Sequence, residues 1–387
     1  IYCDQCRERS IVAFSCKCRG FCNSCGSKRS VETTEHIIKR VFPSAPVRQW
    51  VLTVPVSLRY WMARDSKLLN GVHEEIFGSL KKFYKRHFGK WAEGQAEFGG
   101  ITFIHRFSSN LALNVHFHIL VPEVAFEADP NGLSLTYVDR VKEQDVVKVL
   151  NDMTARIIKF LERRGLIGDR QSEHYDEENM GWGEALAQSS LSKLGEKIGS
   201  GFGVYGEKAV VKKGLSAKQH NFSLHAGVWV ADDQPKKLRQ LIGYVSRAPL
   251  ARERLEWRRG KVELTLKRPW QDGTHKISFE PYNFLKSLAA IVPSPWTNQV
   301  RYWGVFGANH RWRHAICKAV VRRRGYSRVS YRIPWAQLLR HSFAQDLSYC
   351  QRCNAPTRVI SVITERRVIN RILRSMRISS LPPPLVY

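Results

Sequence analysis

The sequence predicts an α+β protein in which an antiparallel sheet is flanked by helices, with a cysteine-rich module before it and a basic region after it. Three observations support this class. Strand-like runs rich in β-branched and aromatic residues alternate with helical patterns, two of the runs are close enough to form a hairpin, and six of the nine cysteines fall within the first 25 residues. The 387 residues, 43% of them hydrophobic, are enough for two or three domains.

The strands are predicted from composition and alternation. RQWVLTVP (48–55) is expected to be a central strand, and GITFIHRF (100–107) and NVHFHILV (114–121) form a hairpin across a short polar connection. NFSLHAGVWV (221–230) alternates in the same way. Nearer the C-terminus, KVELTLKRPW and GTHKISFEP predict a second hairpin.

Helices are expected between these strands. One long helix is predicted over about 57–90, and residues 145–167 repeat apolar side chains at helical spacing. A short amphipathic helix begins after Asp232 or Asp233 and ends before Pro249, and FLKSLAAIV predicts a helix in the C-terminal region. Residues 168–203 are polar and contain several glycines, which indicates a loop-rich insertion.

These elements predict three parts. Residues 1–45 form a cysteine-rich module, residues 46–255 form the α+β domain, and residues 256–387 form a basic accessory region. The charge of the chain and the motifs described below assign zinc binding and DNA recognition to the first part, catalysis to the second and DNA binding to the third.

The charge of the chain points to a polyanionic partner. Lys and Arg number 62 against 34 Asp and Glu, which gives a net charge of +28. Nucleic acid is the first candidate. An anionic membrane is the rival, but no apolar run approaches the roughly 18 to 20 residues of a spanning helix, and no signal sequence opens the chain. We therefore expect no membrane partner and a cytoplasmic protein.

The cysteine spacing predicts zinc. Two C-x-x-C pairs separated by 15 residues would supply a four-thiolate site from Cys3, Cys6, Cys22 and Cys25. Cys16 and Cys18 remain as spares, alternates or part of a second site. Near the other end, the pair Cys350 and Cys353 is a half-site that could belong to a further zinc ion. Such spacing fits a reducing compartment better than a disulfide framework.

Three histidines in the predicted hairpin are candidate ligands of a catalytic Mg²⁺ or Mn²⁺. His116 and His118 are two residues apart, so both imidazoles lie on one strand face, and His105 is carried by the preceding strand. Imidazoles can hold a divalent ion while leaving positions open for a phosphate. The alternative is that they are core histidines whose hydrogen bonds are satisfied within the fold.

Tyr244 is the candidate nucleophile. It lies off the apolar stripe of its amphipathic helix, where it is free to face a ligand, although a half-buried tyrosine at the rim is the plainer alternative. On nucleic acid, the ion could polarise a phosphate and Tyr244 could attack phosphorus in line, giving a phosphotyrosine bond that a freed hydroxyl can reverse. Arg247 is a candidate for charge neutralisation.

A basic aromatic tract near residues 301–328 predicts contact with single-stranded DNA, because aromatic rings can stack on bases while arginines neutralise phosphates. The alternative is a solvated run of charge. The candidate contact residues are Trp303, Arg311, Trp312, Arg313, Arg322, Arg323 and Arg324.

Several segments in a fixed order resemble the HUH endonuclease transposases of the insertion sequence ninety-one group and their common-region relatives. They are the cysteine-rich YCDQC to SCKCRGFCNSCGSKR, then WVLTVP, RFSSNLALNVHFHILV, FSLHAGVWV, YVSRAPLARERL, LKRPWQDGTHKISFEP, RYWGVFGANHRWR and CQRCNAPTRVI. The resemblance implies an HUH-type sheet and a bacterial, nucleoid-associated transposase. Such an enzyme nicks single-stranded or hairpin element ends, forms a 5′-phosphotyrosine and moves DNA by a rolling-circle-like route.

The resemblance also implies roles for individual residues. The two histidines of the family motif correspond to His116 and His118, and the nucleophile to Tyr244. The third ligand is expected to be His105, with His225 in reserve. Gln240 stands where the founding branch has a second tyrosine, so the chain is similar to the single-tyrosine, common-region branch. There, one tyrosine acts twice or two protomers act together as a homodimer.

Two other functions fit parts of the pattern. A replication initiator or relaxase would share the chemistry, but the chain contains no P-loop G-x-x-x-x-G-K-[ST] of a partner helicase. A non-catalytic, zinc-containing DNA-binding regulator would have no need of His116, His118 and Tyr244 together.

Overall fold

The computed structural model describes residues 1–10, 23–87, 96–129, 132–138, 140–167, 210–212, 214–247, 250, 254–293, 297–323, 348–363 and 365–375. The chain divides into two compact units, Ile1–Cys16 with Ile333–Tyr387 and Lys17–Arg332. The smaller unit therefore combines both ends of the chain. The three-part division with borders near residues 45 and 255 stays a prediction. The two compact units divide the chain at other positions, because residues 1–16 belong with the C-terminal segment and residues 17–45 belong to the larger unit.

The larger unit is built on a seven-stranded antiparallel sheet with the order β14-β4-β5-β2-β10-β9-β8. The strands predicted at its centre are confirmed, including the histidine-bearing hairpin. Their bounds are β2 (Val47–Thr53), β4 (Gly99–Phe107), β5 (Leu113–Pro122), β8 (Val210–Lys212), β9 (Ser216–Gln219), β10 (Phe222–Val230) and β14 (Val300–Gly304).

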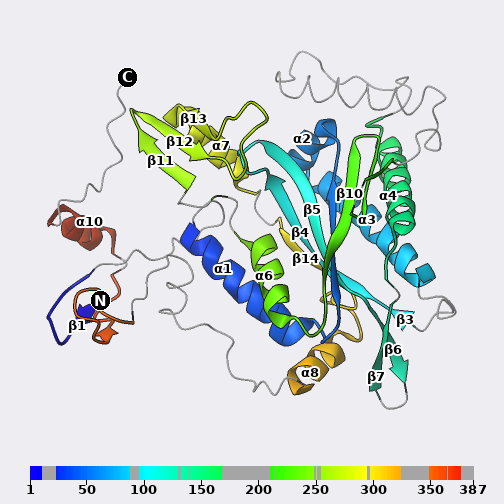
Figure 1. Ribbon diagram of the computed structural model, residues 1–387, viewed down its shortest axis with the longest axis horizontal. Helices are drawn as coiled ribbons and strands as arrows, with labels where there is room; N and C mark the ends of the chain where they lie inside the picture. The colour runs from blue at the N-terminus through cyan, green and yellow to red at the C-terminus, as the bar shows by residue number, and fades with distance from the viewer. Residues whose placement is uncertain are drawn as a thin grey trace. The chain divides into compact units, whose positions relative to one another are not determined.

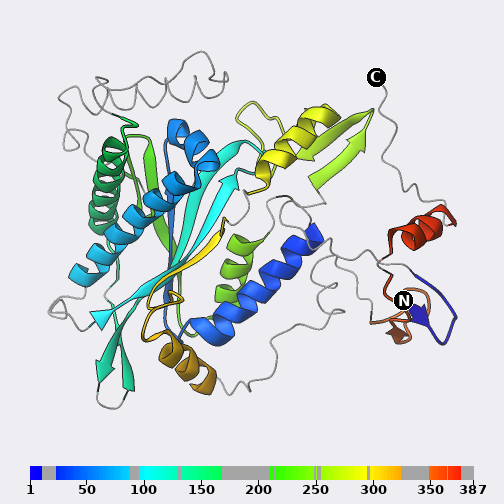
Figure 2. The same ribbon diagram turned by 180° about the vertical axis from the view of Figure 1, so that it is seen from behind.

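Helices cover both faces of this sheet, which confirms the predicted fold class (Figure 1). One face carries α2 (Val56–Arg64), α3 (Ser66–His87) and α4 (Glu143–Arg163). The other carries α1 (Asn23–His36), its short continuation η1 (Ile37–Val41), α6 (Pro235–Ser246) and α8 (Arg313–Arg323), as the reverse view in Figure 2 also shows.

Strand β5 shows how the sheet separates its two faces. Val115, Phe117 and Ile119 pack into the core under α2, α3 and α4. Leu120 packs into the core under η1, α6 and α8. Because successive side chains of a strand point to opposite faces, His116 and His118 share the face that α6 covers.

The single helix predicted over 57–90 is wrong, because it is broken at Asp65. There the backbone is extended, with φ −97° and ψ 106°. The Asp65 carboxylate accepts hydrogen bonds from the N–H groups of Lys67 (2.7 Å) and Leu68 (3.1 Å), so it caps the start of α3. The sequence therefore forms two helices, α2 and α3, that meet at this cap.

Smaller elements complete the larger unit. The predicted C-terminal hairpin is present as β12 (Lys261–Thr265) and β13 (Lys276–Phe279), joined by β11 (Leu255–Arg258) into a three-stranded sheet beside α7 (Pro281–Ile291). A second small sheet comprises β3 (Ala96–Glu97), β6 (Val124–Asp129) and β7 (Gly132–Tyr137). The predicted insertion at 168–203 lies outside the described residues.

The smaller unit contains β1 (Tyr2–Cys3), β15 (Thr357–Arg358) and α10 (Arg366–Ser375). β1 and β15 pair in antiparallel fashion, with Cys3 opposite Thr357. Within the described part of the chain, no helix is long and apolar enough to cross a membrane.

A buried ion pair links the central strands. Arg48 and Glu123 are each 3% exposed and form a two-point contact through Nε and Nη2 of the guanidinium. Arg48 Nη1 also donates to the Ala226 carbonyl of β10 at 2.9 Å, and Trp229 Nε1 donates to Glu123 at 2.8 Å. Both charged groups are thus compensated inside the fold, as burial requires.

We predict that Glu123→Ala lowers the free energy of unfolding by about 3 to 5 kcal/mol, because it leaves the Arg48 charge buried without a partner. Urea titration followed by tryptophan fluorescence measures the change. The matched control is Glu256→Ala, since Glu256 forms an exposed pair with Lys276 at 2.9 Å, and solvent screening of this pair should leave the free energy of unfolding almost unchanged. Equal losses in the two variants would show that burial of the Arg48 pair is unimportant.

Candidate active site

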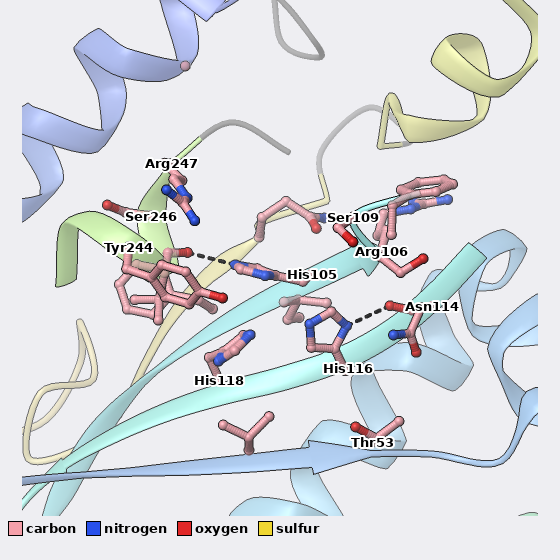
Figure 3. A pocket seen from close by; sticks show the side chains of 18 of the residues that line it. Thr53, His105, Arg106, Ser109, Asn114, His116, His118, Tyr244, Ser246 and Arg247 are labelled. Carbon is pink, nitrogen blue, oxygen red and sulfur yellow. Dashed lines mark hydrogen bonds between the residues drawn. The ribbon is translucent and has the colours of Figure 1, made fainter. Parts of the chain in front are cut away.

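Three imidazoles converge on the sheet face beneath α6. His105 of β4 lies directly opposite His116 of β5, and His118 is two residues further along the same face. Each histidine offers a nitrogen, and these three nitrogens lie within 4.8 Å of one another. Figure 3 shows the three rings facing one pocket. The convergence predicted from the hairpin is therefore present, and its use as a metal site stays a prediction.

Hydrogen bonds leave two of these rings with a free lone pair toward the cluster. His116 Nδ1–H donates to the Asn114 carbonyl at 2.7 Å, so its Nε2 is the unprotonated nitrogen. His105 Nε2–H donates to the Val245 carbonyl of α6 at 2.7 Å, so its Nδ1 is unprotonated. Unprotonated ring nitrogens are what metal coordination requires.

His118 is held from the other side by Gln49 of β2. Gln49 Nε2 lies 2.8 Å from His118 Nδ1. With the amide in the opposite orientation, which exchanges its oxygen and nitrogen, Gln49 Oε1 accepts from Nδ1–H and leaves His118 Nε2 unprotonated. Both orientations fit one hydrogen bond, and only the second presents the lone pair of Nε2 to an ion.

Burial keeps the three imidazoles neutral at pH 7. It lowers the pKa of His105 to about 4 and that of His118 to about 2, with the neighbouring histidines adding to the effect. The pKa of His116 is also lowered, mainly by burial. Three neutral imidazoles without a carboxylate fit a divalent transition ion such as Mn²⁺ at least as well as Mg²⁺.

Tyr244 reaches this cluster from α6. The apolar stripe of α6 is buried through Leu238, Ile242 and Val245, whereas Tyr244 is 48% exposed and faces the pocket (Figure 3). Its ring centroid lies 6.4 Å from that of His118. The sequence-based placement of Tyr244 off the stripe is therefore what the structure shows.

Helix α1 supports the helix that carries Tyr244. The Ser30 hydroxyl lies 2.7 Å from that of Ser246 and donates to the Gly243 carbonyl at 3.3 Å. Together with the bond from His105 to Val245, these contacts hold the last turn of α6 between α1 and the sheet. The position of Tyr244 thus depends on three elements distant in sequence.

The pocket around Tyr244 is positively charged. The Arg247 guanidinium lies 4.5 Å from the Tyr244 ring centroid, and Lys267 Nζ lies 5.8 Å from it. Burial, together with Arg247, lowers the pKa of Lys267. The cavity measures about 1290 Å³, and no described residue lining it is acidic. Its cationic lining comprises Arg29, Arg106, Arg247, Lys267 and Arg268. Such a cavity attracts a polyanion.

Three residues of the site were missed in the sequence. Gln49 lies between Arg48 and Trp50 in β2, and Lys267 lies in the connection between β12 and β13; neither residue type marks a site at its position. Trp270 was missed as well; it lines the cavity and is 47% exposed. Only its position after a basic Lys267-Arg268 pair could have suggested contact with nucleic acid.

The reserve ligand His225 lies outside the cluster. It pairs with Val51 of β2, which in turn pairs with His118, so His225 is two strands away from β5 and three strands away from β4. Among the described residues, the candidate metal ligands at this site are His105, His116 and His118 alone.

The prediction that Trp303 contacts DNA is wrong. Trp303 is 6% exposed, its Nε1 donates to Thr102 Oγ1 at 2.9 Å, and its ring packs against Phe77 and Phe98. An aromatic residue in a basic tract can equally be a core residue. The register of β14, which pairs Trp303 with Gly100 of β4, decides that its side chain is buried.

The rest of the tract stays a prediction. Arg311 is exposed and lies over the Trp312 ring at 4.8 Å, whereas Arg313 donates to the Phe306 carbonyl. Arg324 and the side chains of Arg322 and Arg323 lie outside the described residues.

The cysteines group differently from the predicted tetrad. Cys3 and Cys6 lie with Cys350 and Cys353, and the four Sγ atoms are within 4.8 Å of one another. Cys25 is buried in α1 of the larger unit and is not part of this group. Cys16, Cys18 and Cys22 lie outside the described residues. The prediction from spacing grouped cysteines that are close in sequence. In the structure, the pairing of strand β1 with strand β15 brings the N-terminal and C-terminal cysteine pairs together.

We predict that His116→Ala lowers the affinity for Mn²⁺ by more than about 100-fold, because the loss of a ligand should exceed the 10- to 100-fold effect of an outer partner. Titration followed by electron paramagnetic resonance measures free Mn²⁺. His225→Ala is the matched control and should bind as wild type does. An equal loss in both variants would contradict the ligand assignment.

Gln49→Leu is expected to weaken Mn²⁺ binding about 10- to 100-fold, since His118 loses the partner that fixes its ring. Gln49→Glu should restore binding, because a carboxylate accepts a hydrogen bond from Nδ1–H. The same Mn²⁺ titration tests both variants. Wild-type affinity in Gln49→Leu would show that Gln49 does not orient the ligand.

Comparisons with known proteins agree with this geometry. Residues 99–313 match a family profile described as "Putative transposase", and residues 1–54 match the transposase zinc-binding domain of the insertion sequence ninety-one type. No curated protein and no solved structure matches the chain. The first profile covers more than half of the chain, including the three histidines and Tyr244. The zinc-binding profile lies N-terminal to it, in the order that the resemblance to this family implies. The chain therefore belongs to the insertion sequence ninety-one family of transposases.

Proposed function

We propose that this transposase nicks and rejoins single-stranded DNA at the ends of a mobile element through a 5′-phosphotyrosine on Tyr244. The observation that carries the proposal is the position of Tyr244 beside three neutral imidazoles in a cationic cavity. A structural tyrosine would need neither the ligand cluster nor the surrounding positive charge.

The cleavage step forms one bond and breaks one. The Tyr244 oxygen attacks phosphorus, the new Tyr–O–P bond replaces the bond to the 3′ oxygen, and that oxygen takes up a proton to become a free 3′-hydroxyl. The phenolic proton passes to solvent. When a 3′-hydroxyl attacks the phosphotyrosine, the DNA strand is joined and Tyr244 is restored, so the sequence of steps needs no ATP.

His105, His116 and His118 would hold Mg²⁺ or Mn²⁺, which supplies Lewis-acid polarisation of the phosphate. Arg247 and Lys267 lie on the Tyr244 side of the pocket and would offset the charge that builds on the phosphate oxygens. Because no described lining residue is acidic, the negative charge of a DNA phosphate meets no repulsion there.

Trp270 favours an unpaired strand as the substrate. Its half-exposed ring lines the same cavity as Tyr244 and can stack on a base that is not paired. Bases inside a duplex offer no free face to such a ring.

Gln240 bears on how the second strand transfer occurs. It is exposed on α6, one turn before Tyr244, and cannot form a phosphodiester of the same kind. The proposed cycle therefore uses Tyr244 twice or draws on the tyrosine of a second protomer in a homodimer.

We predict a covalent adduct that depends on Tyr244. Single-stranded oligonucleotides tiling the DNA that flanks the gene carry one fluorophore at each end and are incubated with protein and Mn²⁺. On a denaturing gel, the 3′ label should migrate with the protein and the 5′ label should be released, because the linkage is to the 5′ phosphate. Tyr244→Phe should abolish the adduct.

Tyr302→Phe is the matched control, because Tyr302 lines the same cavity, and it should retain the adduct. Loss of the adduct only in Tyr302→Phe would assign the nucleophile to that residue. Migration of the 5′ label with the protein would contradict the polarity. Binding without an adduct across all oligonucleotides would favour a DNA-binding regulator.

A further inference from the structure

The two ends of the chain form the same local structure. In the N-terminal segment, the Cys3 N–H donates to the Glu8 carbonyl at 3.0 Å, and Arg7 has a positive φ of 59°. In the C-terminal segment, the Cys350 N–H donates to the Ala355 carbonyl at 2.7 Å, and Asn354 has a positive φ of 55°. Each C-x-x-C pair is thus followed by one left-handed residue and closed by a bond between equivalent positions.

The repeat extends to the flanking residues. Tyr2, just before the first pair, forms an antiparallel bridge with Arg9, and Tyr349 forms the equivalent bridge with Pro356. The two segments are therefore a pair of matching knuckles, the unit from which four-cysteine zinc sites of the ribbon type are built.

The sulfur positions fit one tetrahedral ion. Cys3 Sγ lies 3.5 Å from Cys353 Sγ, and Cys6 Sγ lies 3.5 Å from Cys350 Sγ. A zinc ion with four Zn–S bonds of about 2.3 Å requires S···S separations of about 3.8 Å. A disulfide would require about 2.05 Å, and all four cysteines are free thiols.

The geometry points to one structural zinc ion bound by Cys3, Cys6, Cys350 and Cys353, so that the C-terminal end completes the zinc module that begins the chain. The family match to the zinc-binding domain covers residues 1–54 only and supplies half of these ligands. The ion would close a loop across nearly the whole chain, and it is independent of the histidine site.

The small size of the core explains why a metal is needed there. The apolar cluster of the described part of this unit contains the four cysteines and Ala355. Its ion pairs, Arg358 with Asp4 and Arg352 with Glu8, are exposed and contribute little. With so little buried surface, the zinc–thiolate bonds are the main interaction that holds the two ends together.

The test is the zinc content of the purified full-length protein, measured by mass spectrometry of the metal. Cys350→Ser and Cys353→Ser should each contain one zinc ion fewer per chain than wild type. Cys317→Ser is the matched control, because Cys317 lies on α8 outside the tetrad, and it should retain the wild-type content. Wild-type zinc content in both C-terminal variants would overturn the proposal.

A second measurement uses the unaltered protein, so it does not depend on the folding of variants. Iodoacetamide labelling and peptide mass spectrometry report which thiols are protected before and after a mercurial reagent displaces zinc. Cys3, Cys6, Cys350 and Cys353 should be protected together and become reactive together, with release of one zinc ion. Labelling of Cys350 and Cys353 while Cys3 and Cys6 stay protected would show that the N-terminal module binds its ion alone.

Discussion

The register between β4 and β5 is the constraint on which the rest of the site depends. It sets His105 opposite His116 and, through the alternation of strand side chains, places His118 on the same face. A slip of one residue would turn the imidazoles of β5 into the core beneath α2, α3 and α4 and bring Phe117 to the pocket. The apolar residues between the histidines therefore act as register markers, because they are stable only on the buried face.

The histidine cluster also fixes the helix above it. His105 donates a hydrogen bond from Nε2 to the Val245 carbonyl. The side chain that faces the candidate ion site therefore also holds the turn that carries Tyr244. Ser30 of α1 secures that turn from the opposite side. The distance between Tyr244 and the imidazoles is thus set by hydrogen bonds across three elements, and a helix held in this way needs no ligand to bring Tyr244 to the cluster.

Much of the fold was predictable, and the failures have specific causes. The strands, the hairpin and the apolar stripes of α4 and α6 follow from local periodicity, which the sequence displays directly. The break at Asp65 was missed because a long helical pattern hides a single capping residue. Trp303 was misassigned because it lies within a basic aromatic tract, whereas its neighbours in space are Phe77, Phe98 and Thr102.

The sequence by itself determined the chemistry that is carried within one element: two histidines on one strand face, a tyrosine off a helix stripe, and cysteine pairs with the spacing of a zinc knuckle. Only the tertiary structure decided which of these groups meet. Gln49 reaches His118 from a neighbouring strand, and Cys3 and Cys6 meet Cys350 and Cys353 from the far end of the chain. Spacing encodes local geometry because backbone periods are fixed, but pairing between distant segments depends on the energy of the whole fold, which no short pattern records.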